Sequence, residues 1–221
     1  MTDLTPQRLA EGLTYYVVLL FSLSVHESAH GWAASKMGDD TAVRQGRVSL
    51  NPLVHIDPIG TLLIPLLQIF WGGIPLMGWA KPTPVGAHNF RRLAQGHLLV
   101  AGAGPVSNLC LAALFTAALW VVHGVGLDAA DTTTRAVRTL IETGVVMNIA
   151  LAVFNLVPLP PLDGSWVASW GLPRSIAQQY DSIVEPYGQW ILLVLFATGI
   201  LGRIVGPLIG LLLSVVRYIV Y

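Results

Sequence analysis

The chain has 221 residues, of which 54% are hydrophobic and 11% are charged, and its formal net charge is zero. A soluble domain carries about 25% charged residues, so this composition predicts an integral membrane protein. The balanced charge and the lack of basic runs in the sequence argue against nucleic acid as a partner. Cys110 is the single cysteine, so no disulfide within the chain is expected.

The first apolar stretch runs from Leu9 to Met37 and is long enough, at about 1.5 Å per residue, to cross a hydrocarbon core of about 30 Å. Its second half contains the pattern H-E-x-x-H, with His26, Glu27 and His30. Histidines four residues apart lie on one face of a helix and can hold one zinc ion, and the glutamate is placed to act as a base. Ionisable side chains within a membrane span are costly, so this group indicates a function.

The following segment, residues 38–60, is polar and rich in Gly and Pro, and its alternating pieces, such as residues 42–50, indicate strand or loop rather than helix. Residues 61–71 are apolar but short, and Pro65 interrupts them. Residues 72–87 are again rich in Gly and Pro and are expected to be extended.

Four further apolar stretches long enough for helices follow, with a polar segment at residues 165–185 in their midst. They are Leu98–Val122, Val137–Val157, Tyr187–Leu201 and Ile204–Tyr221, the last two joined by a tight link at Gly202-Arg203. We therefore expect an all-α polytopic membrane protein with about five transmembrane helices. A membrane-embedded re-entrant or β segment is expected between the first and second full spans.

These elements are expected to form one domain over residues 1–221, with a core at residues 9–165 and a C-terminal helix pair at residues 186–221.

A catalytic zinc ion usually has three protein ligands and a water, so a third ligand is needed besides the two histidines. The candidates are Asp163, Asp57, Glu142, His55, His88, His97 and His123. Asp163 is the strongest of them, because prolines end the preceding helix and Gly164 permits a turn beside it.

The order of the spans allows a check on this choice. His26 and His30 lie towards the end of the first span, and Asp163 follows the end of Val137–Val157, so these two spans must run in the same direction for the side chains to meet. The span Leu98–Val122 supplies the return crossing. A full crossing by residues 61–71 would break this parity, so we expect that segment to be re-entrant or interfacial.

Other polar residues have two interpretations each. Asn155 either caps backbone groups at the end of its helix or donates its amide to a developing oxyanion. Asp57 precedes a proline, as in an Asx-Pro turn, and His55 beside it is a substrate contact or a loop group rather than a ligand. Asn108 is expected to form an interhelical hydrogen bond.

The distribution of Lys and Arg predicts the orientation of the protein. The side that holds the zinc-proximal helix ends carries Lys36, Arg44, Arg47, Lys81, Arg91, Arg92, Arg174 and Arg217, and the opposite side carries Arg8, Arg135, Arg138 and Arg203. This difference places the candidate site nearer the cytoplasm.

Five motifs occur in order: residues 26–30, 46–60, 78–85, 103–108 and 155–164. Together they resemble the site-2 protease family of intramembrane zinc metalloproteases, and most closely its compact bacterial branch without PDZ or CBS domains. One departure is that the motif helix is the first span here, so a preceding helix found in other members is missing.

The resemblance implies that His26, His30 and Asp163 hold one zinc ion per chain, that Glu27 activates a water and that Asn155 stabilises the oxyanion. It also implies membrane-embedded β structure over residues 38–87, to which an unwound substrate would add as a strand. The implied partners are single-span membrane proteins and the lipid bilayer, and the implied location is a bacterial cell membrane.

Two other functions are consistent with parts of the pattern. A membrane zinc transporter or metal-binding protein would need several sets of ligands along a path, and the sequence contains one. A catalytically inactive scaffold would not need the intact Glu27.

Overall fold

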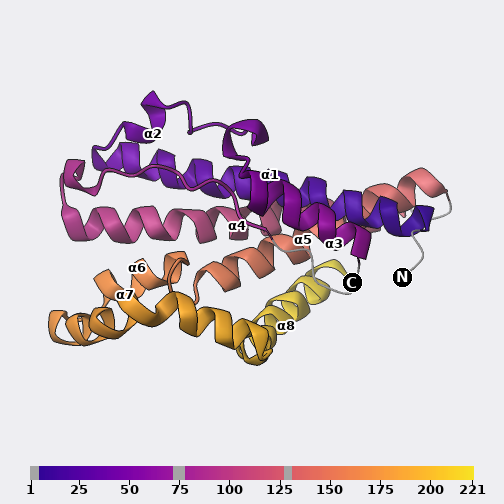
Figure 1. The fold of residues 1–221 in the computed structure, drawn as a ribbon. Helices are drawn as coiled ribbons and strands as arrows, with labels where there is room; N and C mark the ends of the chain where they lie inside the picture. Colours follow the sequence, from indigo (N-terminus) through magenta and orange to yellow (C-terminus); the bar gives the residue numbers. More distant parts are fainter. Residues whose placement is uncertain (1–4, 72–77, 127–130) are drawn as a thin grey trace.

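The computed structural model describes residues 5–71, 78–126 and 131–221. Its helices are α1 (Pro6–Met37), α2 (Thr41–Arg44), α3 (Ile64–Trp71), α4 (Leu93–Gly124), α5 (Thr132–Asn155), α6 (Asp163–Gly171), α7 (Arg174–Ala197) and α8 (Ile200–Val220), with single turns η1 (Pro52–His55), η2 (Pro58–Leu63) and η3 (Ala87–Asn89) between them (Figure 1). The described residues contain no β-strand, which confirms the all-α class.

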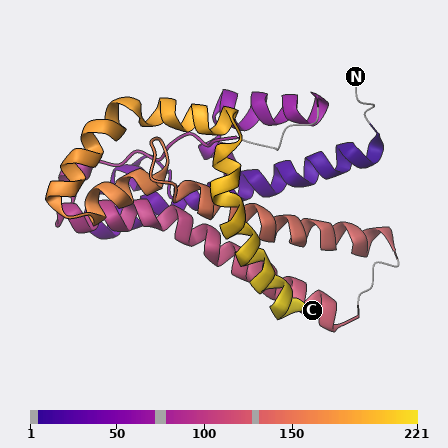
Figure 2. The ribbon, with the colours of Figure 1, turned by 90° about the horizontal axis from the view of Figure 1, so that it is seen from below.

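Three long helices, α1, α4 and α5, pack side by side and form the centre of the molecule (Figures 1 and 2). Val18, Leu19 and Leu23 of α1 form an apolar cluster with Met147 of α5, and α4 and α5 share a second cluster. Helices α1 and α5 run in the same direction and α4 runs back between them, so the predicted parity is confirmed.

Among the described residues, four helices are long and apolar enough to cross a membrane: α1, α4, α5 and α8. The protein is therefore an integral membrane protein, but the expected fifth span at residues 187–201 is not found. The helix there, α7, begins at Arg174 in polar sequence, and its apolar part at residues 187–197 is only about 16 Å long at 1.5 Å per residue. The chain then turns at Gly199, whose φ is 71°, rather than at the predicted Gly202-Arg203 link.

The segment between α1 and α4 starts and finishes at the same end of the bundle. The backbone N–H of Arg91 donates a 2.9 Å hydrogen bond to the carbonyl of Met37, so the two helix ends are tied together. Between them the chain runs along α1 through α3 and then returns (Figure 1). This is the path that a re-entrant segment requires.

The strand interpretation of residues 42–50 is not confirmed. Residues 41–44 form the short helix α2, and a turn at Gly46 (φ 66°) brings the N–H of Arg47 to the carbonyl of Ala42. A turn that needs a positive φ breaks the alternation of a strand. The predicted extended segment at residues 72–87 lies partly outside the described residues, since 72–77 are not described.

We call the extended, proline-containing segment at residues 78–86 the strap. It runs against α1, and two of its backbone N–H groups donate to the preceding segment: Trp79 N–H to the carbonyl of Gly60, and Lys81 N–H to the carbonyl of His55. The strap is held by isolated hydrogen bonds rather than by a sheet.

Asp39 anchors the end of the strap to the end of α1. Its buried carboxylate accepts hydrogen bonds from Thr41, from the N–H of Gly86 and from the side chain of Asn89. Burial opposes ionisation, but these hydrogen bonds, led by that of Thr41, outweigh it and hold the pKa of Asp39 below its usual value.

Candidate active site

His26 and His30 lie one turn apart on the buried face of α1. Their Nε2 atoms are 3.0 Å apart and their rings are nearly perpendicular, at 83°. Helix α4 crosses directly over them at Gly104, where a Cβ atom would lie 2.5 Å from His26 Cε1 and 2.5 Å from His30 Nε2. The two rings therefore occupy space that only a glycine leaves open.

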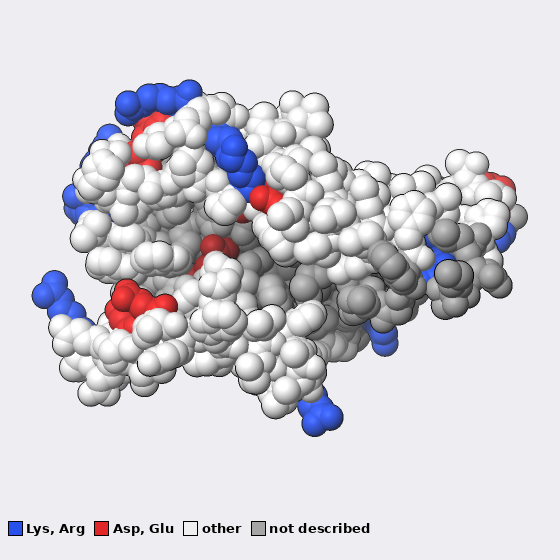
Figure 3. All heavy atoms as spheres, in the orientation of Figure 1, with Lys and Arg blue, Asp and Glu red and all other residues white. Residues whose placement is uncertain are grey.

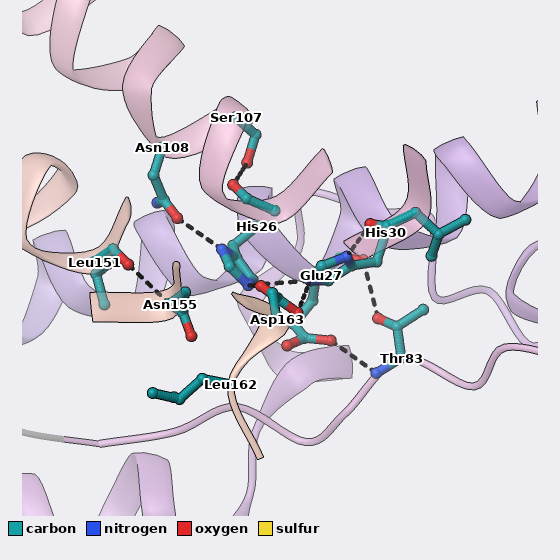
Figure 4. A network of polar contacts seen from close by, with 12 residues as sticks. His26, Glu27, His30, Thr83, Ser107, Asn108, Leu151, Asn155, Leu162 and Asp163 are labelled. Atoms are coloured by element: carbon teal, nitrogen blue, oxygen red, sulfur yellow. Dashed lines mark hydrogen bonds and ion pairs between the residues drawn. The ribbon is translucent and has the colours of Figure 1, made fainter. Parts of the chain in front are cut away.

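Asp163 is the first residue of α6, and it completes a cluster with the two histidines (Figure 4). Its Oδ2 lies 3.2 Å from Nε2 of His26, and its Oδ1 lies 3.4 Å from Nε2 of His30. The turn after α5 brings Gly164 back against the end of that helix. A Cβ at Gly164 would lie 2.3 Å from the carbonyl oxygen of Leu156, so a glycine is needed beside Asp163. The sequence prediction that Asp163 joins the histidines is thus matched by the geometry.

The cluster has the chemistry of a zinc site. Nδ1 of His30 lies 2.7 Å from the carbonyl of Val100, which only accepts, so Nδ1 carries the ring proton and Nε2 presents a lone pair. Oδ2 of Asp163 is buried and receives no hydrogen bond. Lone pairs and a carboxylate that converge without a donor call for a cation, and imidazole nitrogen and carboxylate oxygen are ligands that zinc prefers.

Glu27 lies beside this cluster and is held by the strap. Its Oε2 accepts a 2.7 Å hydrogen bond from the backbone N–H of Thr83, and the Thr83 hydroxyl donates to the Glu27 carbonyl at 2.9 Å. Atoms of Glu27, His26 and His30 that can bind a metal all lie within 4.8 Å of one another. The carboxylate is therefore next to the cation position, where a base would have to be.

Asn155 is the last residue of α5, and Figure 4 shows its bond to Leu151. Its side-chain amide donates a 2.9 Å hydrogen bond to the carbonyl of Leu151 in its own helix. This carbonyl lies one turn inside α5 and is not one of those freed at the helix end, so the capping interpretation of Asn155 stays a prediction. The role in stabilising an oxyanion stays a prediction, for which the second N–H of the amide would serve.

The other candidate ligands do not join the cluster. His55 is buried and bonds the carbonyl of Ser49, and Asp57 caps the N–H groups of Ile59 and Gly60, as expected of an Asx-Pro turn. The remaining four lie elsewhere: Glu142 pairs with Arg138, His97 stacks on Trp166 and Trp170, His123 contacts Tyr221, and His88 lies in η3.

Sequence reasoning missed three features of the site: Gly104 above the histidines, Thr83 against Glu27, and the partners of Asn108. The expected interhelical hydrogen bond of Asn108 is present, but the sequence did not identify its partners, Nδ1 of His26 at 2.7 Å and Oδ1 of Asn148 at 2.9 Å. In the sequence, Gly104 and Asn108 are visible as a glycine and an amide four positions apart in one apolar span. That spacing does not reveal which residues of the neighbouring helices face them.

Comparison with known proteins identifies the family of this chain. The sequence pattern of Peptidase family M50, the site-2 protease family, matches residues 121–196 of this chain. The chain is 37% identical over 194 residues to "Putative zinc metalloprotease YwhC" of Bacillus subtilis, which covers 88% of this chain and 84% of the relative. It is 30% identical to "Putative zinc metalloprotease Rip2" of Mycolicibacterium smegmatis, over 83% of this chain and 66% of the relative. No solved structure matches significantly.

The family match and the apolar helices identify an integral membrane protein of the metalloprotease class. The chain belongs to peptidase family M50, the site-2 protease family of zinc metalloproteases.

Proposed function

We propose that this protein is an intramembrane protease that cleaves peptide bonds within or near the transmembrane segments of single-span membrane proteins, as in regulated intramembrane proteolysis. The observation that carries the proposal is the position of His26 and His30 on α1, a helix that can span a membrane, with Asp163 at the start of the short helix α6 beside them. His30 lies seven residues before the end of α1, about 10 Å along the helix at 1.5 Å per residue. The site therefore lies below the helix end rather than on an appended soluble domain.

One zinc ion held by His26, His30 and Asp163 would lower the pKa of a bound water and polarise the scissile carbonyl. Glu27 would take the proton from the water and later deliver it to the leaving amine. The hydrogen bond from Thr83 orients the Glu27 carboxylate for this task. Asn155 would donate its second amide N–H to the oxyanion.

A substrate helix has to unwind before it reaches this site, because its peptide bonds are shielded by hydrogen bonds within the helix. The strap offers a place for the unwound segment, since it lies against Glu27 and is already extended. Figure 3 shows a hollow in the surface between the α1 side and the α6–α7 side of the molecule, with acidic atoms inside it. This hollow is the proposed route for the unwound segment.

We also propose that the site lies nearer the cytoplasmic face of a bacterial cell membrane. Several Lys and Arg side chains gather at the end of the molecule that contains α2 and the start of α7 (Figure 3). Positive charge favours the cytoplasmic side. A labelling reagent that does not cross membranes should leave a cysteine placed at Arg174 unmodified in intact cells.

Replacement of Glu27 by Gln tests the protease. The E27Q variant should bind zinc as the wild type does but lose cleavage of a single-span reporter by at least about 100-fold, the usual contribution of a general base. The matched control is Glu185→Gln on the exposed face of α7, which should cleave normally. Persistent cleavage by E27Q would contradict the proposal. Zinc transport by wild-type vesicles without reporter cleavage would favour the transporter alternative.

A further inference from the structure

A chain of buried amides connects the zinc-ligand candidate His26 with the backbone of α5. Nδ1 of His26 lies 2.7 Å from Oδ1 of Asn108, and the Asn108 amide donates to Oδ1 of Asn148 at 2.9 Å. The amide of Asn148 then donates to the carbonyl of Gly144 at 2.8 Å and to the hydroxyl of Ser22 at 3.0 Å. Both asparagines are fully buried.

The Gly144 carbonyl fixes the orientation of every side chain in this hydrogen-bonded series. The Gly144 carbonyl can only accept, so Asn148 must turn its NH₂ group towards it. Oδ1 of Asn148 then faces Asn108 and needs a donor, which forces the NH₂ group of Asn108 towards Asn148.

The same reasoning continues to the histidine. With its NH₂ group used, Asn108 presents Oδ1 to His26, and an acceptor there requires the ring proton of His26 to be on Nδ1. Nε2 of His26 then carries a lone pair, and it is this atom that faces His30 and Asp163. The opposite amide orientation would set two oxygens against each other at Gly144, in a buried place where water cannot relieve them.

We infer that Asn108 and Asn148 are positioning residues that fix the tautomer of His26, and so present its Nε2 to the metal, with the Gly144 carbonyl as the fixed reference. His30 obtains the same tautomer directly from the Val100 carbonyl. The tautomers of the two histidines are thus fixed in different ways. The Val100 carbonyl contacts His30 directly, whereas the Gly144 carbonyl acts on His26 through two asparagine side chains. Outer partners of this kind typically change metal affinity by about 10- to 100-fold.

The inference rests on the proposal that His26 is a zinc ligand, and it predicts a specific coupling. The amide of Asn148 reaches the His26 ring through Asn108, whereas its bond to Ser22 of α1 does not touch that ring. Replacing Asn108 by Leu should therefore weaken zinc binding by about 10- to 100-fold, and replacing Asn148 by Leu should weaken it by less. The double variant should bind zinc no more weakly than Asn108→Leu alone, because the second change has nothing left to disturb.

The experiment is a zinc competition against a chelator with the purified full-length protein, with helix content measured for each variant. Thr116→Val is the matched control, since its buried hydroxyl on α4 bonds only the carbonyl of Ala112 in its own helix, and it should bind zinc as the wild type does. Losses that add in the double variant, or wild-type affinity in Asn108→Leu, would overturn the inference.

A second measurement needs no replaced asparagine. In zinc-loaded wild-type protein labelled with ¹⁵N-histidine, the His26 signal, identified by its loss in His26→Gln, should show the proton on Nδ1. A proton on Nε2 would overturn the tautomer assignment while leaving the protease proposal in place. Failure of the protease proposal shows separately, as a wild-type protein that binds no zinc or cleaves no reporter.

Discussion

The central bundle of α1, α4 and α5 differs sharply from the C-terminal helix α8 in how it buries its residues. In the most apolar stretch of α5, 50% of the residues are buried inside the protein, compared with 6% in α8. Helix α5 buries polar side chains such as Asn148 and Thr143, whereas α8 turns large apolar side chains such as Ile204 and Leu211 outward.

The difference shows that two physical requirements shape this membrane protein. In the central bundle, buried polar groups need partners at fixed distances, so single atoms matter. In α8, apolar side chains need only an apolar surrounding, which lipid provides as well as protein does. Substitutions in the two regions should therefore have very different effects.

The largest effect is expected at Gly104. An alanine there would push against both histidine rings, so Gly104→Ala should lower zinc affinity and reduce kcat/KM by about 100-fold, as displacements of about 1 Å do. Gly102→Ala on the same helix is the control, because a Cβ there meets nothing within 4 Å. Reporter cleavage and zinc content measure both variants. Equal behaviour of the two would show that the bundle tolerates changes as α8 does.

A smaller effect is expected at Thr83, which touches the site through its backbone. Thr83→Pro removes the N–H that holds Glu27, so kcat should fall by about 10-fold, part of the contribution of a general base, with zinc affinity unchanged. Thr83→Val keeps this N–H and should lose less. Steady-state cleavage and zinc competition separate the two effects. A wild-type kcat in Thr83→Pro would mean that the strap does not orient Glu27.

Asp39 tests whether buried polar partners also stabilise the region beside the site. Asp39→Ala should lower the free energy of unfolding by about 2–3 kcal/mol, because the Gly86 N–H and the Asn89 amide lose a charged acceptor. Asp40→Ala, next to it and exposed, should change little. Chemical or thermal unfolding in detergent measures both.

The pH dependence of stability provides a check on Asp39. Its pKa is lowered in the folded protein, so its contribution is fully present above the unfolded value of about 4 and is lost as the pH falls through the folded value. Asp39→Ala should therefore differ from the wild type at neutral pH and approach it in acid. A difference that does not depend on pH would show that packing, not the carboxylate, is responsible.

The smallest effect is expected in α8. A Cβ at Gly206 meets nothing within 4 Å, so Gly206→Ala should leave cleavage unchanged and raise the free energy of unfolding by about 0.5–1 kcal/mol, the usual gain in a helix interior. Unfolding and cleavage assays measure it. A loss of activity would show that something packs closely against α8, which would remove the contrast with the central bundle.

The sequence identifies the candidate site residues better than it identifies the boundaries of the helices. The metal motif was recognisable because its members lie within one helical turn, and Asp163 because prolines and a glycine mark the end of a helix. The fifth span is not confirmed, and the Gly202-Arg203 link was wrong, because several glycines in this part of the sequence permit a turn and the chain turns at Gly199.

The residues that contact the candidate ligands and Glu27 were harder to predict than the ligands themselves. Asn108 and Asn148 are forty residues apart in the chain, and which amide faces which depends on the register of α4 against α5. That register results from many small contacts summed over two helices, which no local pattern reports. The strap is similar, since its contact with Glu27 joins residues 56 positions apart.

The sequence by itself determined that this is an integral membrane protein, that His26, Glu27 and His30 share one helix face, and that Asp163 ends up on the same side of the bundle. These follow from composition, from helical periodicity and from the parity of the spans. Only the tertiary structure decided that a glycine leaves room for the two rings, that a strap holds Glu27 and that the Asn108 amide, held by Asn148, faces His26. Spacing along a helix is local, whereas these contacts depend on distances between helices that are set by packing.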